Sequence, residues 1–365
     1  MLTWLGLGGA LLAGGVAAAV AAGRRGVSVR DLFRQEPSQN AIPAASVPDL
    51  MARTRAARAA TNLYQLDALA ATLQPRAASL LRRMAADHLA HLRALGAAPP
   101  ATATPAATTA PGATPTAGTG PSRQVAAHPS SVIAAEWAAA RTALTDVGTT
   151  GPGMATLLAR LAACRAVHAD LLRRRTGQAP LGLLQPAPAA TAAPTAGAAA
   201  PTGSAAASAD GAIATAGDAA APAATPSPLP SAAGQAFAAL LAGEHAAVFA
   251  YGVLTARATS SHQALARDLW AEHRQARDTL AALLVAHNET PPAADPAYDV
   301  GPMPTTQAQV TALAVRVEKG LATVAAVAVA QSEGDLRRLA AGYLVAAARR
   351  SAGWTGSTDA LPGLR

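Results

Sequence analysis

The sequence predicts an all-α protein built from two four-helix bundles in tandem, joined by a disordered Pro/Ala-rich linker. Aromatic residues make up only 3% of the 365 residues, which disfavours a large β-sandwich or barrel. Alanine, leucine and arginine are abundant, and these residues favour helices. Apolar residues also recur at three- and four-residue steps in eight segments, as expected for amphipathic helices.

The C-terminal part of the chain contains four of these segments. They span residues 232–257, 261–287, 306–330 and the stretch from Gly334 to Trp354. The connection over residues 288–304 holds five prolines, whereas the other two connections are short. This pattern is typical of a four-helix bundle with one long crossover. On the last helix, the inward line is predicted to run through Leu339, Tyr343, Ala346 and Arg350.

The N-terminal part repeats this plan with helices predicted over residues 48–73, 75–95, 129–144 and 154–175. The second helices of the two halves share a short motif, Ala86-Asp87-His88 in one and Ala271-Glu272-His273 in the other. We therefore predict one bundle over residues 47–177 and another over residues 231–362.

Two low-complexity tracts rich in Pro, Ala, Thr and Gly separate the helices. Residues 99–127 take the place of the crossover in the first bundle, and residues 178–230 join the bundles. Neither tract can bury enough apolar area to offset the entropy of ordering, so both are predicted to be disordered.

The first 26 residues are predicted to be a signal peptide or a membrane anchor. Residues 2–22 are uncharged and long enough to cross a bilayer as a helix. Small residues around Val20 resemble a signal cleavage site, while Arg24 and Arg25 after the run favour a cytoplasmic C-terminal side. The Pro/Ala/Thr tracts favour export, so the predicted location is extracytoplasmic, either anchored or secreted.

The charge of the chain narrows the classes of partner. The formal net charge is +8, and Lys319 is the only lysine. The sequence has no phosphate-binding glycine loop and no aromatic stacking platform, so no nucleic-acid partner is predicted. An anionic surface remains an alternative ligand for the arginines. Cys164 is the only cysteine and is expected to be a small buried filler, because no disulfide or Cys-based zinc site can form within the chain.

The C-terminal half also carries a longer motif, Glu244-His245-Ala-Ala-Val-Phe-Ala-Tyr251-Gly252, on its first helix. Further matching stretches are His273 to Asp278, Val317 to Gly320 and Ala348 to Arg350 with Trp354. These residues resemble a ferritin-like domain of unknown function, found mainly in exported proteins of high-GC bacteria. The resemblance covers residues 231–362, and residues 47–177 look like a divergent second copy. It implies a ferritin-like fold and an extracytoplasmic setting, and no established activity.

A di-iron centre of the ferritin-like type needs Glu-x-x-His motifs on two helices. The second bundle lacks them, because Glu272 directly precedes His273 and the last helix has neither Glu nor His. Arg350 stands where a metal ligand is expected. We therefore predict a buried polar cluster in which the guanidinium of Arg350 replaces the metal. Its members are Glu244, His273, Glu318 and Arg350.

The first bundle has a different set of candidates. His88, Glu136 and His168 lie on three predicted helices and could hold one divalent ion. The alternative, which the sequence favours, is interior histidines with hydrogen-bonded partners. Asp67 is placed off the buried stripe of the first helix, and His91 on the surface or edge of the second.

These observations predict an exported or membrane-anchored protein without catalytic activity, acting as a structural or interaction module of the cell envelope. Its expected partners are the membrane, through residues 2–22, and an unidentified protein. One alternative is a metal-binding or redox protein that uses iron or another divalent metal. The other is a binder of anionic surfaces.

Overall fold

A computed structural model describes residues 27–28, 46–100, 128–179, 181–182 and 228–364. These residues form eight α-helices and one pair of two-residue strands. The helices are α3 (Val47–Leu73), α4 (Ala78–Ala94), α6 (Pro129–Val147), α7 (Pro152–Arg175), α8 (Ser231–Arg257), α9 (Ser260–Ala286), α10 (Gln307–Gln331) and α11 (Gly334–Thr355). The strands β1 (Val27–Ser28) and β2 (Tyr298–Asp299) pair in parallel. The predicted all-α class is confirmed.

Local capping signals explain where several helices begin and end. α3 starts after Ser46, which exchanges hydrogen bonds with Asp49 in a capping box. Pro129 and Pro152 open α6 and α7, where the missing N–H costs no hydrogen bond. α11 ends at Gly356, whose φ of 66° is readily adopted only by glycine.

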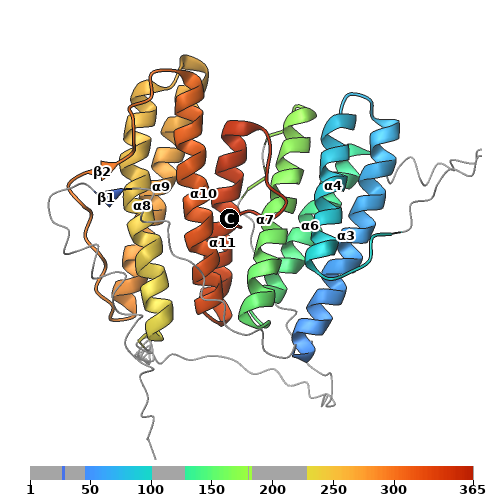
Figure 1. Ribbon diagram of the computed structural model, residues 1–365, viewed down its shortest axis with the longest axis horizontal. Helices are drawn as coiled ribbons and strands as arrows, with labels where there is room; N and C mark the ends of the chain where they lie inside the picture. Colours follow the sequence, from blue (N-terminus) through green and yellow to red (C-terminus); the bar gives the residue numbers. More distant parts are fainter. Residues whose placement is uncertain (1–26, 29–45, 101–127, 180, 183–227, 365) are drawn as a thin grey trace, which may run out of the picture.

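We call α3, α4, α6 and α7 the first bundle, and α8, α9, α10 and α11 the second bundle. In the first, α3 packs on α4 and α6, and α6 packs on α7. In the second, α8 packs on α9 and α10, and α10 packs on α11. Figure 1 shows the helices side by side with roughly parallel axes, so that α7 and α11 meet in the middle of the array.

The two bundles contact each other through α7, which packs against α10 and α11. Asp170 on α7 accepts hydrogen bonds from Arg349 Nε at 2.6 Å and from the backbone N–H of Leu181 at 2.9 Å. Arg349 also donates to the carbonyls of Leu181 and Gly182, and its guanidinium lies 5.7 Å from the centre of the Trp137 ring. Arg349 of the second bundle therefore contacts α6, α7 and the segment that follows α7.

The helix bounds predicted from the sequence agree with the structure within three residues. On the predicted inward line of α11, Arg350 is buried and Leu339 and Tyr343 pack partly buried against the core, while Ala340 and Leu344 beside that line are fully buried. Because α11 packs against α10 and also against α7, its buried face extends beyond the predicted line.

The predicted signal or anchor in residues 1–26 lies outside the described residues, as do residues 101–127 and 183–227 of the two low-complexity tracts. Among the described helices, α8 alone is long and apolar enough to cross a membrane. Because 56% of its most apolar window is buried, α8 is explained by its place in the core.

Candidate functional site

The second bundle encloses a cluster of four charged side chains, one from each helix: Glu244, His273, Glu318 and Arg350. All four are buried. His273 Nδ1 lies 2.7 Å from Glu244 Oε2, and His273 Nε2 lies 2.9 Å from Glu318 Oε1. Because a carboxylate can only accept, both ring nitrogens carry a proton and His273 is an imidazolium cation.

Within this cluster, Arg350 is bound mainly to Glu318 and lies farther from Glu244. Its Nε donates to Glu318 Oε2 at 2.9 Å, whereas its Nη2 lies 3.9 Å from Glu244 Oε1. Tyr251 donates its hydroxyl hydrogen to Glu318 Oε1 at 2.6 Å, and Trp354 Nε1 donates to the Tyr251 oxygen at 3.1 Å. Glu318 is therefore the centre of the cluster.

The charges of this cluster balance, since two carboxylates face one imidazolium and one guanidinium. Burial by itself would raise the pKa of Glu318, but Arg350 and His273 outweigh that effect and lower it to about 2. Burial and the charge of Arg350 lower the pKa of His273, yet Glu318 and Glu244 oppose them and leave it above its ordinary value. The cluster is thus electrically complete without an ion.

The raised pKa of His273 predicts how stability depends on pH. A group whose pKa is higher in the folded state stabilises the fold at low pH and loses this contribution as pH rises through the folded pKa. We expect the free energy of unfolding to fall above pH 6.5 by up to about 1.4 kcal/mol per pH unit. Urea unfolding between pH 6 and 9 measures this slope, and a His273→Gln variant should show a smaller one. Equal slopes in both proteins would contradict the assignment of charge to His273.

The first bundle also encloses one candidate from each helix: Asp67, His88, Glu136 and His168. His88 Nε2 lies 2.8 Å from Glu136 Oε1 and 3.3 Å from Asp67 Oδ2. His168 Nδ1 lies 3.0 Å from the same Glu136 oxygen. One ligand atom each from His88, Glu136 and His168 falls within 4.8 Å of the other two, so the structure brings all three sequence-predicted candidates together.

Two carboxylate oxygens in this cluster have neither a hydrogen bond nor an ion pair among the described residues. They are Oδ1 of Asp67 and Oε2 of Glu136, whereas Oδ2 of Asp67 makes no hydrogen bond but lies within ion-pair distance of His88 Nε2. Burial raises the pKa of Asp67 to about 6, although His88 opposes this effect. Buried polar atoms without partners are costly and rare, so the two oxygens that lack any contact call for an explanation.

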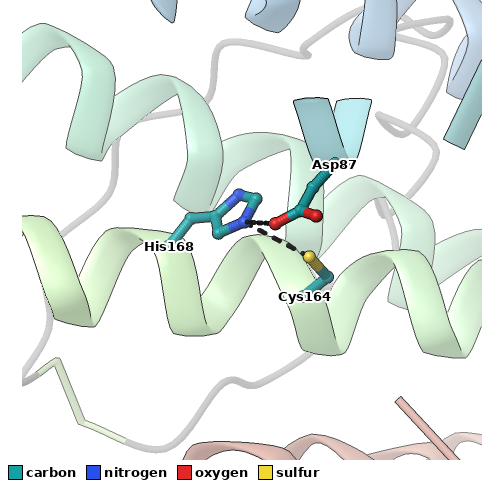
Figure 2. Close-up of side chains that lie close together, drawn as sticks. All are labelled: Asp87, Cys164 and His168. Carbon is teal, nitrogen blue, oxygen red and sulfur yellow. Dashed lines mark hydrogen bonds and ion pairs between the residues drawn. The ribbon is translucent and has the colours of Figure 1, made fainter. Parts of the chain in front are cut away.

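The other ring nitrogen of His168, Nε2, contacts two further residues. Figure 2 shows His168 Nε2 facing both Asp87 Oδ2, at 3.0 Å, and Cys164 Sγ, at 3.3 Å. Burial raises the pKa of the Cys164 thiol, so this cysteine is not an activated nucleophile. Cys164 is also fully buried, which denies a substrate access to its sulfur.

His88 likewise has a partner on its other nitrogen. Its Nδ1 lies 3.3 Å from Nδ1 of His91, and His91 Nε2 lies 2.8 Å from the carbonyl oxygen of Ala360. Burial, reinforced by the charge of Arg165, places the pKa of His91 well below its ordinary value, so His91 is neutral.

Two placements from the sequence are wrong, since Asp67 and His91 both have an exposed fraction of 0%. Asp67 lies on a buried stripe of α3 that includes Ala60, Leu63 and Ala70. His91 lies on the same buried face of α4 as Met84 and His88, and the segment that follows α11 covers it.

The two clusters are built alike up to the last helix. In each bundle the second helix supplies a histidine, His88 or His273, and the third supplies a glutamate, Glu136 or Glu318. The fourth helix supplies His168 in the first bundle and Arg350 in the second. A neutral imidazole can bind a metal ion and a guanidinium cannot, so the clusters differ in chemistry at this position.

Comparisons with known proteins agree with a domain in the C-terminal half. No curated protein matches the chain. Among solved structures, a conserved hypothetical protein, Rv2844, from Mycobacterium tuberculosis is similar at 31% sequence identity, with a TM-score of 0.34. The match covers 34% of this chain and 89% of that one. Residues 236–365 match the family described as "Domain of unknown function (DUF4439)". The C-terminal half of this chain thus contains a domain of unknown function of the DUF4439 family.

Proposed function

We propose that this protein is a non-catalytic structural module whose first bundle is held together by one divalent transition-metal ion. The proposed ligands are His88, Glu136 and His168. Two imidazoles and one carboxylate suit zinc or iron(II). The observation that carries the proposal is that two buried carboxylate oxygens, Asp67 Oδ1 and Glu136 Oε2, have no partner among the described residues, since a cation next to them would compensate their burial.

The distances in the cluster fit this role. Metal–ligand bonds of about 2.0–2.2 Å place neighbouring ligand atoms of a tetrahedral site roughly 3.4 Å apart. The atoms of His88 and His168 lie 2.8 and 3.0 Å from Glu136 Oε1, so a shift of about 0.5 Å admits an ion. Asp67 borders the same position and would stabilise a fourth ligand by accepting a hydrogen bond from it.

The outer partners of the two histidines support the same role. Metal-bound histidines usually donate their other ring N–H to a carboxylate, a carbonyl or another acceptor. His168 has Asp87 in that place and His88 has His91. Each proposed imidazole ligand is therefore held in orientation by a second residue.

Burial argues for a structural ion rather than a catalytic one. His88 and Glu136 have an exposed fraction of 0%, and His168 of 1%. A catalytic metal keeps one position open to substrate, whereas a structural metal is enclosed. In the second bundle, the proposed ferritin-like arrangement is held by Arg350 in place of an ion.

The sequence supports the envelope as the setting of this module, with the membrane as partner through residues 2–22. An unidentified protein partner remains part of this proposal. Sequencing the mature N-terminus distinguishes a cleaved signal from a retained anchor.

The proposal is tested by titrating chelator-treated protein with Zn²⁺ in a calorimeter. We expect one ion per chain for the native sequence. Glu136→Gln should weaken Zn²⁺ binding by more than about 100-fold. This exceeds the loss expected when a residue that only supports a ligand is replaced, because Glu136 is proposed to bind the ion directly. The matched control is Glu272→Gln, because the Glu272 side chain is 56% exposed on α9. Absence of binding, or equal binding by Glu136→Gln, would overturn the metal site.

A further inference from the structure

We propose that one end of the first bundle docks on the surface of an anionic membrane. This end, which we call the basic end, carries six arginines: Arg76, Arg82, Arg83, Arg173, Arg174 and Arg175. The choice of a membrane rests on the partner proposed above, whereas the metal site plays no part in it. The inference adds which surface of the helices meets the membrane.

The ends of three helices bring these arginines together. Arg76 lies in the turn between α3 and α4, and Arg82 and Arg83 lie in the first two turns of α4. α7 ends at Arg175, whose Nε and Nη2 donate to the carbonyl oxygen of Arg76 at 2.9 and 2.7 Å. The end of α7 therefore adjoins the α3–α4 turn (Figure 1). All six arginines are exposed except Arg173, which is half-buried.

The charges of the basic end are not neutralised within the described part of the chain. No ion pair there includes any of the six arginines. Residues 74–83 and 171–179 contain no Asp or Glu. Asp67, Asp87 and Asp170 lie closest to these stretches along the described chain, and each is buried or paired with another side chain.

The stability of the helices accounts for only part of this arrangement. The three arginines in the last turn of α7 are favoured by the helix dipole, which is negative at a C-terminal end. Arg82 and Arg83 lie near the N-terminal end of α4, where the dipole gives a cation no benefit. Because like charges repel one another, gathering all six destabilises the fold, whereas a negatively charged surface would attract them.

The start of the chain is tied to the same end of the helices. β1 begins at Val27, five residues after the end of the predicted membrane run 2–22, so at most about 18 Å separates the two. β1 pairs with β2, where the ring centre of Tyr298 lies 5.7 Å from that of Phe249 on α8. Phe249 is about 12 Å from the C-terminal end of α8.

The C-terminal ends of α8, α11 and α7 adjoin one another in turn. Trp354 at the end of α11 donates its indole N–H to the Tyr251 oxygen, in the last two turns of α8, at 3.1 Å. A Cβ on Gly353 of α11 would lie 3.8 Å from Arg174 Nη2 at the end of α7. A membrane run that ends near β2 therefore brings the bilayer to the end of the helices that carries the arginines.

An anionic bilayer matches the chemistry of the basic end. Guanidinium groups bind phosphate oxygens in bidentate pairs, and anionic headgroups present such oxygens across a broad surface. Each arginine close to such a surface strengthens binding on the order of fivefold. Nucleic acid fits less well, because residues 74–83 and 171–179 contain no aromatic side chain on which bases could stack.

A fluorophore at either end of the first bundle tests the docking in the full chain. The probes are attached through Ser79→Cys at the basic end and Thr54→Cys near the start of α3, since both positions are exposed and the native Cys164 is buried. Vesicles of phosphatidylcholine and phosphatidylglycerol carry a headgroup nitroxide that quenches nearby fluorophores. We expect strong quenching of the Ser79 probe alone at about 0.1 M salt, and loss of this difference at about 1 M salt. Vesicles of phosphatidylcholine alone should also abolish it.

The variant Arg82→Gln/Arg83→Gln should shift the docking equilibrium by about 25-fold toward the undocked state, about fivefold for each charge. The matched control is Arg53→Gln/Arg93→Gln, which removes two exposed charges near the other ends of α3 and α4. The control should leave the quenching of the Ser79 probe unchanged.

Equal quenching of the two probes, stronger quenching at Thr54, or equal docking by the two double variants would overturn the basic end as the docking face. Tighter binding of single-stranded RNA than of the vesicles at the same salt would assign this end to nucleic acid and overturn the proposal as well. A chain that stays in solution with every vesicle composition would contradict the membrane partner itself. That result is distinct from a chain that binds vesicles without docking its basic end.

Discussion

Replacing Arg350 with methionine is expected to destabilise the protein by about 3–5 kcal/mol, the usual cost of removing one partner from a buried ion pair. Arg350 is the main counter-charge of Glu318, and it lies 3.9 Å from Glu244. Without it, two buried carboxylates share the single positive charge of His273. Urea unfolding at pH 6.5 measures the loss. The control is Arg274→Met on the exposed side of α9, where Arg274 only covers Trp270.

A second substitution separates charge balance from simple loss of packing. Glu244→Gln removes one negative charge and leaves an amide oxygen that can still accept from His273. In the native background we expect this change to destabilise the fold. In the Arg350→Met background it restores one carboxylate to one imidazolium, so it should stabilise the fold. The same sign in both backgrounds would contradict a charge-balanced cluster, as would an Arg350→Met variant no less stable than its control.

The second large effect is expected from the metal itself. A ligand that binds only the folded state stabilises it by about 4.1 kcal/mol at a free concentration 1,000 times its dissociation constant. We expect Zn²⁺ to raise the free energy of unfolding of chelator-treated protein by this order, because His88, Glu136 and His168 come together only in the fold. Urea unfolding with increasing free Zn²⁺ gives the dependence.

The matched variant for this prediction is Glu136→Gln, which keeps the size of the side chain and removes its charge. Its stability should no longer respond to Zn²⁺, while Glu272→Gln should respond like the native chain. A response that persists in Glu136→Gln would place the ion elsewhere. No response in the native chain would mean that the two imidazoles neutralise the carboxylates as imidazolium ions.

Apolar periodicity predicted the eight helices because their buried residues recur at three- and four-residue steps. Apolar periodicity did not identify Asp67 as buried, because the buried stripe of α3 is mostly alanine. Alanine also occurs at exposed positions of this chain, so it marks a buried face poorly. Its spacing from Ala60, Leu63 and Ala70 does place Asp67 on that stripe. Treating alanine as a core residue would have found it.

Long-range contacts account for the rest of what the sequence did not reveal. His91 lies three residues after His88 and four before Leu95, a spacing that fits a buried face of α4. What covers His91 is the carbonyl of Ala360, which is 269 positions away in the chain. The wide buried face of α11 has the same origin, because it depends on α7 of the other bundle.

The most direct measurement is an X-ray anomalous difference map of Zn²⁺-soaked crystals at the zinc absorption edge. Our interpretation predicts one peak per chain, within bonding distance of His88, Glu136 and His168, and no peak among Glu244, His273 and Glu318. A peak in the second bundle would contradict the role of Arg350 as a substitute for metal. A map without a peak in the first bundle would contradict the metal site.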